Sequence, residues 1–184
     1  SGSSSESQVA PAAIQKELSP GASQLFVFFG GIRGGINMPP FEFYKSAKIL
    51  DEHTIFVRDL RQCYYQTGLV GVSRDIPSTA AFLRTEIESL SPSRVVLVGN
   101  SMGGFAAILF AGLIPGAEAI AFSPRTSFAP LLPLSHRDRQ YWKLHLKVFL
   151  LSAFKMHVWD LKPLLRRTET PPKVSLYYAE DHVL

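Results

Sequence analysis

The chain has 184 residues, 46% of them hydrophobic, so it is long enough to bury one sizeable core and a single domain is expected. No apolar run approaches about 18 residues, which excludes a membrane-spanning helix. The formal net charge is +4, but residues 125–167 alone hold nine Lys or Arg and two Asp, a net charge of +7. The positive charge therefore belongs to one segment.

The amino-terminal residues are small and polar, and residues 1–20 are expected to be a disordered lead or tag. Within them, residues 10–18 allow a short helix. No signal peptide is expected. Cys63 is the single cysteine, which rules out an intramolecular disulfide and favours a reducing, cytoplasmic location. Cys63 is not favoured as a nucleophile, because no histidine pattern accompanies it.

From residue 25 onward, the predicted elements alternate between strand and helix. Residues 25–29 are a continuous apolar run, typical of a strand buried on both faces. Four glycines follow within residues 30–35, where they let the backbone approach a ligand closely. Apolar residues at helical spacing then predict a helix over 41–50, and a β-rich run predicts a strand over 54–57.

A loop of polar and aromatic residues, 58–68, follows that strand. Loops at the carboxyl ends of parallel strands carry the ligand contacts in open α/β sheets. Tyr64 and Tyr65, with Arg61, are therefore candidates to line a substrate pocket. Packing of the aromatic rings within a surface loop is an equal alternative.

The next helix is expected over 79–90, with Asp75 or Ser78 as its cap. A strand over 95–98, a helix over 102–114 and a strand over 118–122 follow. Small residues near the start of the helix over 102–114 allow it to lie close to the sheet.

The strand over 95–98 runs directly into Gly-Asn-Ser-Met-Gly-Gly at residues 99–104. A G-x-S-x-G motif between a buried strand and a helix is typical of a nucleophile elbow, in which the turn strains the serine backbone. Gly99 and Gly103 avoid collisions there because they lack a Cβ. Ser101 Oγ would stand above the sheet edge, and the Met102 N–H could stabilise an oxyanion. The alternative is a glycine-rich turn with a structural serine.

On these residues, the sequence resembles the α/β-hydrolase family from about residue 25 to its end. The resemblance implies a three-layer fold, a mostly parallel sheet with helices on both faces, and a serine–acid–histidine triad in that chain order. It also implies that Gly31 or Ile32 gives the second oxyanion N–H. Arg33 lies in the same loop and is a candidate to bind an anionic substrate group, the alternative being a side chain in water.

A phosphate-cradling loop is the other interpretation of residues 30–35. It is disfavoured because the glycine spacing matches neither G-x-G-x-x-G nor G-x-x-x-x-G-K-[ST].

Residues 126–168 contain both tryptophans and most of the positive charge. The resemblance implies a helical cap insertion here within a single domain over 21–184, and we place Trp142 in the substrate site. Residues 140–154 are broadly apolar, beside a basic ridge at Arg139, Lys143 and Lys147. A lid is favoured over a homodimer contact, and a membrane-surface helix is the least favoured of the three. Asp160 is expected to cap a short helix.

Residues 173–178 are the last predicted strand, and the resemblance assigns the triad acid to Asp181, with Glu180 second. The family histidine comes on a later loop, so either the sequence is cut short or the base comes from elsewhere. His182 is a candidate base, although adjacent side chains in a loop rarely point the same way. The other candidates are His136, His145 and His157, with His53 the least favoured because it precedes a strand.

The expected function is a serine hydrolase or acyltransferase that forms an acyl-enzyme on Ser101 from an ester or thioester. Its substrate would be a small or carrier-linked acyl compound, and the basic segment suggests an anionic group on it. The alternative is an inactive binding or scaffold protein without the base. No cofactor or metal is expected, because no His/Cys/Asp cluster has ligand spacing. No nucleic-acid partner is expected either, because the basic residues are interleaved with aliphatic ones.

Overall fold

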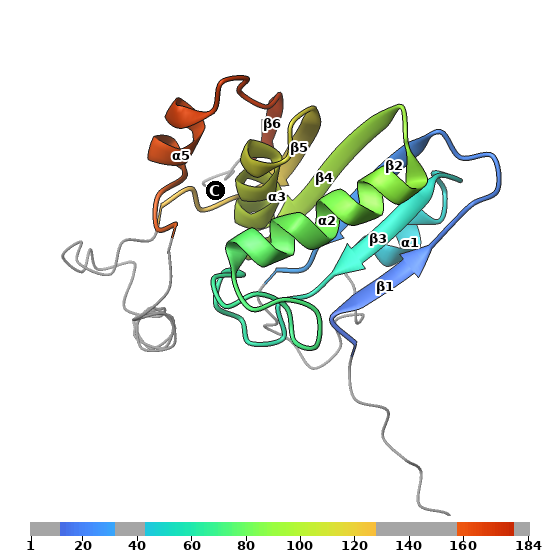
Figure 1. Cartoon of the computed structure of the whole chain (residues 1–184), viewed down its shortest axis with the longest axis horizontal. Coiled ribbons are helices and arrows are strands. Elements are labelled where there is room, and N and C mark those ends of the chain that lie inside the picture. The colour runs from blue at the N-terminus through green and yellow to red at the C-terminus, as the bar shows by residue number, and fades with distance from the viewer. Residues whose placement is uncertain (1–11, 32–42, 128–157, 179–184) are drawn as a thin grey trace, which may run out of the picture.

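The structure is a computed structural model that describes residues 12–31, 43–127 and 158–178 (Figure 1). These residues form one six-stranded sheet in the order β1-β3-β2-β4-β5-β6. Neighbouring strands are parallel except for β1 and β3, which are antiparallel. The strands are β1 (Ile14–Glu17), β2 (Gln24–Phe29), β3 (His53–Val57), β4 (Arg94–Asn100), β5 (Ala117–Phe122) and β6 (Val174–Tyr177).

Helices cover both faces of this sheet. They are α1 (Tyr44–Ala47), α2 (Ile76–Leu90), α3 (Met102–Leu113) and α5 (Leu161–Arg167). The larger core joins one face of the sheet to α2, α3 and α5, and the smaller core joins the other face to α1. The predicted α/β class, with its mostly parallel sheet and helices on both faces, is therefore confirmed.

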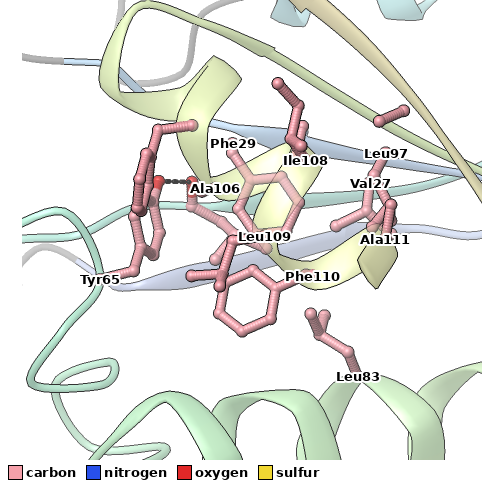
Figure 2. Packing of buried hydrophobic residues seen from close by; sticks show 14 of the residues in the cluster. Val27, Phe29, Tyr65, Leu83, Leu97, Ala106, Ile108, Leu109, Phe110 and Ala111 are labelled. Carbon is pink, nitrogen blue, oxygen red and sulfur yellow. Dashed lines mark hydrogen bonds between the residues drawn. The ribbon is translucent and has the colours of Figure 1, made fainter. Parts of the chain in front are cut away.

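The larger core is built around α3, which is buried from Met102 to Gly112. Phe110 of this helix stacks on Phe29 of β2 with ring centroids 5.4 Å apart, and Leu83 approaches from α2 (Figure 2). Gly112 meets the side chains of α5. Such close packing around one helix fixes its amino-terminal end against the sheet.

The amino-terminal prediction needs a correction. Ile14–Glu17 is a strand, where a short helix within a disordered lead was expected, and Ile14 pairs with Val57. Ala13 is buried, and the Arg58 guanidinium donates to the Ala12 carbonyl at 2.7 Å. Pairing with the edge of β3 overrides the local helix propensity of this stretch, so the folded domain begins before residue 20.

The predicted helix caps are confirmed. The Asp75 carboxylate accepts from the Ser78 N–H at 2.8 Å, and the Ser78 hydroxyl accepts from the Asp75 N–H at 3.1 Å, so both candidates cap α2 as a capping box. Asp160 caps α5 by accepting from the Lys162 N–H at 2.9 Å. The helix expected over 41–50 is shorter than predicted, since α1 spans only Tyr44–Ala47.

The two described segments that flank residues 128–157 lie next to each other. Ser127 forms an antiparallel bridge with Asp160, and the Leu161 N–H donates to the Thr126 carbonyl at 3.0 Å. The Gln66 side-chain amide forms two hydrogen bonds with the backbone of Val158. Its Nε2 donates to the Val158 carbonyl and its Oε1 accepts from the Val158 N–H, each at 3.0 Å. The residues between these ends, which include Trp142 and most of the predicted cap, lie outside the described residues.

Candidate active site

Ser101 joins the end of β4 to the start of α3 with backbone angles of φ 52° and ψ −113°. A positive φ with this ψ belongs to a region that glycine occupies easily and other residues rarely. Holding a serine there costs of order 1–3 kcal/mol. The strained elbow predicted from the sequence is therefore present in the structure.

Glycines make this turn sterically possible. A Cβ on Gly99 would lie 2.1 Å from the Gly103 carbonyl oxygen, and a Cβ on Gly103 would lie 2.1 Å from the Phe29 carbonyl oxygen. Both obstacles are backbone atoms, which cannot rotate away as a side chain can. The expectation that these two glycines leave room for the neighbouring strand and helix is confirmed.

Hydrogen bonds hold the backbone of the elbow, and the Ser101 side chain does not cap the helix that follows. The Ser101 N–H donates to the Phe122 carbonyl at the end of β5, at 2.9 Å, and the Ser101 carbonyl accepts from the Phe105 N–H at 3.1 Å. Within the described residues, the Ser101 side chain makes no capping bond to α3, although serine is a good cap. Ser101, which is partly buried, therefore does not serve as a side-chain cap for the first N–H groups of α3.

The loop after β2 lies against this helix start. The Gly30 N–H donates to the Val57 carbonyl at 2.9 Å, and the Gly30 carbonyl accepts from the Tyr65 hydroxyl at 2.9 Å. A Cβ on Gly103 would be 3.1 Å from the Gly30 carbonyl carbon, so the first turn of α3 touches the Gly30–Gly31 peptide. The structure therefore brings Ser101, Met102 and Gly31 to one edge of the sheet.

The interpretation of Tyr64 and Tyr65 as pocket-lining residues is corrected. Both side chains are at most 1% exposed and belong to the larger core. Tyr64 packs edge-on against Phe105, and Tyr65 packs edge-on against Phe29. The loop folds inward at these positions because an aromatic ring gains more by burial beside α3 than in water.

Asp59 is a site-shaping residue that sequence reasoning missed. Its buried carboxylate accepts three backbone N–H bonds, from Arg61 at 3.0 Å, Cys63 at 2.6 Å and Tyr65 at 2.9 Å. These bonds hold a turn in which Tyr65 has φ 60°. An aspartate directly after a strand was the available signal, since its side chain often accepts from backbone groups further along a turn.

Cys63 lies in the same turn and is fully buried. Burial raises the pKa of its thiol, and the charge of Asp59 raises it further. A thiol must ionise to act as a nucleophile, so this environment disfavours attack by Cys63. The buried environment of Cys63 thus agrees with the expectation that it is not a nucleophile.

Few of the proposed acid, base and substrate-binding residues fall within the described ranges. His53 starts β3 and pairs with Leu25, at the amino-terminal end of the sheet and opposite to Ser101. This position disfavours His53 as the base. Arg61 is described, and its guanidinium donates to the Thr67 carbonyl at 3.1 Å. The following predicted site residues lie outside the described ranges: Ile32, Arg33, His136, Trp142, His145, His157, Glu180, Asp181 and His182.

Two searches of the described part of the chain are negative. It contains no group of three or more His, Cys, Asp or Glu side chains placed to hold a metal ion. Among its helices, none has the length and apolar character needed to cross a membrane.

No protein-family model and no curated protein sequence matches the chain, but many solved structures do. A lipase-esterase related protein from Clostridium acetobutylicum is 14% identical with a TM-score of 0.52, and the match covers 92% of this chain and 91% of that one. The capsule O-acetyltransferase of Neisseria meningitidis serogroup A is 12% identical with a TM-score of 0.54, covering 94% and 85%.

An α/β-hydrolase enzyme from the sediment metagenome of the Mar Chica lagoon in Morocco is 14% identical. Its TM-score is 0.51, and the match covers 90% of this chain and 83% of that one. At these identities the likeness establishes the fold. The chain has the α/β-hydrolase fold, as the elbow motif predicted.

Proposed function

We propose that the protein is a serine enzyme that cleaves or transfers an acyl group through an acyl-enzyme on Ser101. The observation that supports this best is the backbone of Ser101 itself. It adopts a strained conformation that glycine would tolerate better, and its hydroxyl does not cap the helix that it begins. A structural serine would gain nothing from this strain, whereas a nucleophile needs its hydroxyl held in a fixed position at the start of the helix.

The surroundings of Ser101 support stabilisation of an oxyanion. The Met102 N–H lies in the first turn of α3, where the helix dipole favours negative charge. The second donor would be the N–H of Gly31 or of Ile32. Gly31 is favoured because the Gly30–Gly31 peptide touches the first turn of α3. Two preorganised N–H groups would hold the charge of the tetrahedral intermediate, and losing one such donor typically costs about 10²–10³ in rate.

The remaining chemistry rests on the family resemblance. A histidine must take the proton of Ser101 for attack on a carbonyl, and we assign its orientation to Asp181. His182 is the candidate base within the printed sequence. Arg33 and Trp142 are proposed to contact the substrate, an ester or thioester for which the basic segment favours an anionic group.

Labelling with a fluorophosphonate probe tests this proposal. Intact mass would be compared for the protein and its Ser101→Ala variant, and the modified peptide would be mapped. We expect one adduct on Ser101 that is absent in the variant. A folded protein that stays unlabelled, also when extended at its carboxyl end, would contradict the enzyme and favour the binding or scaffold alternative.

A further inference from the structure

We propose that Tyr65 is a positioning residue for the oxyanion site, an inference that rests on the proposed function. Its hydroxyl donates to the Gly30 carbonyl at 2.9 Å, with the Val57 carbonyl a second acceptor at 3.2 Å. The peptide that it holds carries the Gly31 N–H, the proposed second oxyanion donor. Tyr65 thereby acts on the reaction without touching the substrate.

The geometry of one peptide unit links the two groups. A trans peptide is planar, and its C=O and N–H point in opposite directions, so fixing the Gly30 carbonyl also fixes the Gly31 N–H. That N–H points away from the Tyr65 hydroxyl. Because glycine on both sides of this peptide permits many backbone orientations, the hydrogen bond from Tyr65 helps to set the one that the peptide adopts beside Gly103.

Tyr65 is itself held rigidly enough to serve as such an anchor. Its ring is fully buried, edge-on to Phe29 at 5.5 Å and edge-on to Phe110 at 6.4 Å between centroids (Figure 2). Its backbone N–H donates to the Asp59 carboxylate at 2.9 Å, which stabilises the left-handed φ of 60°. The position of the hydroxyl is therefore fixed before any substrate arrives, as preorganised stabilisation requires.

The loop after β3 thus affects the reaction from within the core. A Tyr65→Phe change keeps the ring and its packing but removes the donor to Gly30. The peptide could then rotate and turn the Gly31 N–H away from the developing charge. Because a complete loss of one donor costs about 10²–10³ in rate, a misaligned donor is expected to lower kcat by about 10- to 100-fold with KM little changed.

The test compares full-length wild-type protein, Tyr65→Phe and Thr67→Val. Thr67→Val is the matched control, since it also removes a buried hydroxyl from this loop. The Thr67 hydroxyl contacts Cys63 Sγ at 2.9 Å. For each protein, the rate of fluorophosphonate labelling, kcat and KM with a p-nitrophenyl ester, and the melting temperature would be measured.

We expect Tyr65→Phe to lower the labelling rate and kcat by about 10- to 100-fold, and Thr67→Val to stay within about threefold of wild type. Equal rates in all three proteins, or an equal fall in both variants that follows their melting temperatures, would overturn the positioning role. A wild-type protein that does not label would overturn the proposed function and this inference together, a result distinct from the other two.

Discussion

Gly103, in the first turn of α3, lies directly against the Phe29 carbonyl at the end of β2. A Cβ at this glycine would be only 2.1 Å from the Phe29 oxygen. This approach joins the turn that carries Ser101 to the loop that carries Gly31, two segments far apart in the sequence. The spacing between the two proposed oxyanion donors depends on it.

Gly103→Ala is therefore expected to be severely destabilising. The added methyl group would meet a backbone oxygen, so strand and helix would have to separate, at a cost of about 3 kcal/mol in the free energy of unfolding. Fluorophosphonate labelling should be lost as well. Gly30→Ala is the control for stability, because a Cβ there has no atom closer than 3.5 Å. Equal destabilisation by the two changes in urea unfolding would contradict this account.

The strain at Ser101 predicts an order of stability for two inactive variants. Ser101→Gly removes the penalty of the positive φ, whereas Ser101→Ala keeps it. After allowance for the greater unfolded-state entropy of glycine, we expect the glycine variant to be the more stable by about 1 kcal/mol. Thermal unfolding of both proteins measures the difference. An alanine variant that matches or exceeds the glycine variant would show that the serine is not strained.

Loss of the Gln66 amide is expected to let the chain open locally at Val158. Gln66→Leu would leave the partly buried N–H and carbonyl of Val158 without this partner, which costs about 1 kcal/mol, the lower end of the range for buried groups. Faster hydrogen exchange is expected at Val158 and its neighbours, with little change in α2. Gln15→Leu is the control, since among the described residues the Gln15 side chain bonds only that of Glu17, two residues along the same edge strand. Unchanged exchange at Val158 would contradict the assignment.

The lowered pKa of Glu118 is expected to make the free energy of unfolding depend on pH in acid. The hydrogen bonds from Arg94 lower the pKa of this carboxyl to about 2, with help from Lys173 3.3 Å away. A pKa that is lower in the folded state means that the stabilisation is present above the unfolded pKa of about 4.3 and is lost as the pH falls toward 2.

Glu118→Gln should remove that part of the pH dependence between about pH 4.5 and 2 in unfolding experiments. The effect is expected to be modest and to weaken in salt, because the pair is partly exposed. Labelling of Ser101 should be unaffected, since the pair lies at the other end of the sheet. A profile that keeps its slope in the variant would show that other carboxyls cause it.

Local sequence patterns predicted most of the described elements. The apolar run over 25–29 became β2, and the motif at residues 99–104 became a strained turn between β4 and α3. Both outcomes follow from short-range physics. A continuous apolar run needs burial on both faces, and a glycine on each side of Ser101 permits a turn that few other sequences allow.

The same patterns gave wrong predictions where contacts between segments distant in the sequence determine the structure. Ile14–Glu17 is a strand because β3 offers it an edge, and nothing within the segment itself reveals that edge. Tyr64 and Tyr65 lie in the loop after a strand, where pocket residues are often found, but the turn directs their side chains into the core. That turn depends on the Asp59 carboxylate, whose three bonds a linear pattern does not show.

The sequence alone determined the fold class and the position of the strained turn at Ser101, because strand burial and the geometry of this turn depend on consecutive residues. Only the tertiary structure placed the Gly30–Gly31 peptide against Gly103 in the first turn of α3 and put the Tyr65 hydroxyl on the Gly30 carbonyl. These groups come from separate loops that meet because the ends of parallel strands share one edge of the sheet. How closely they meet is set by core packing around α3, a property of the folded chain as a whole.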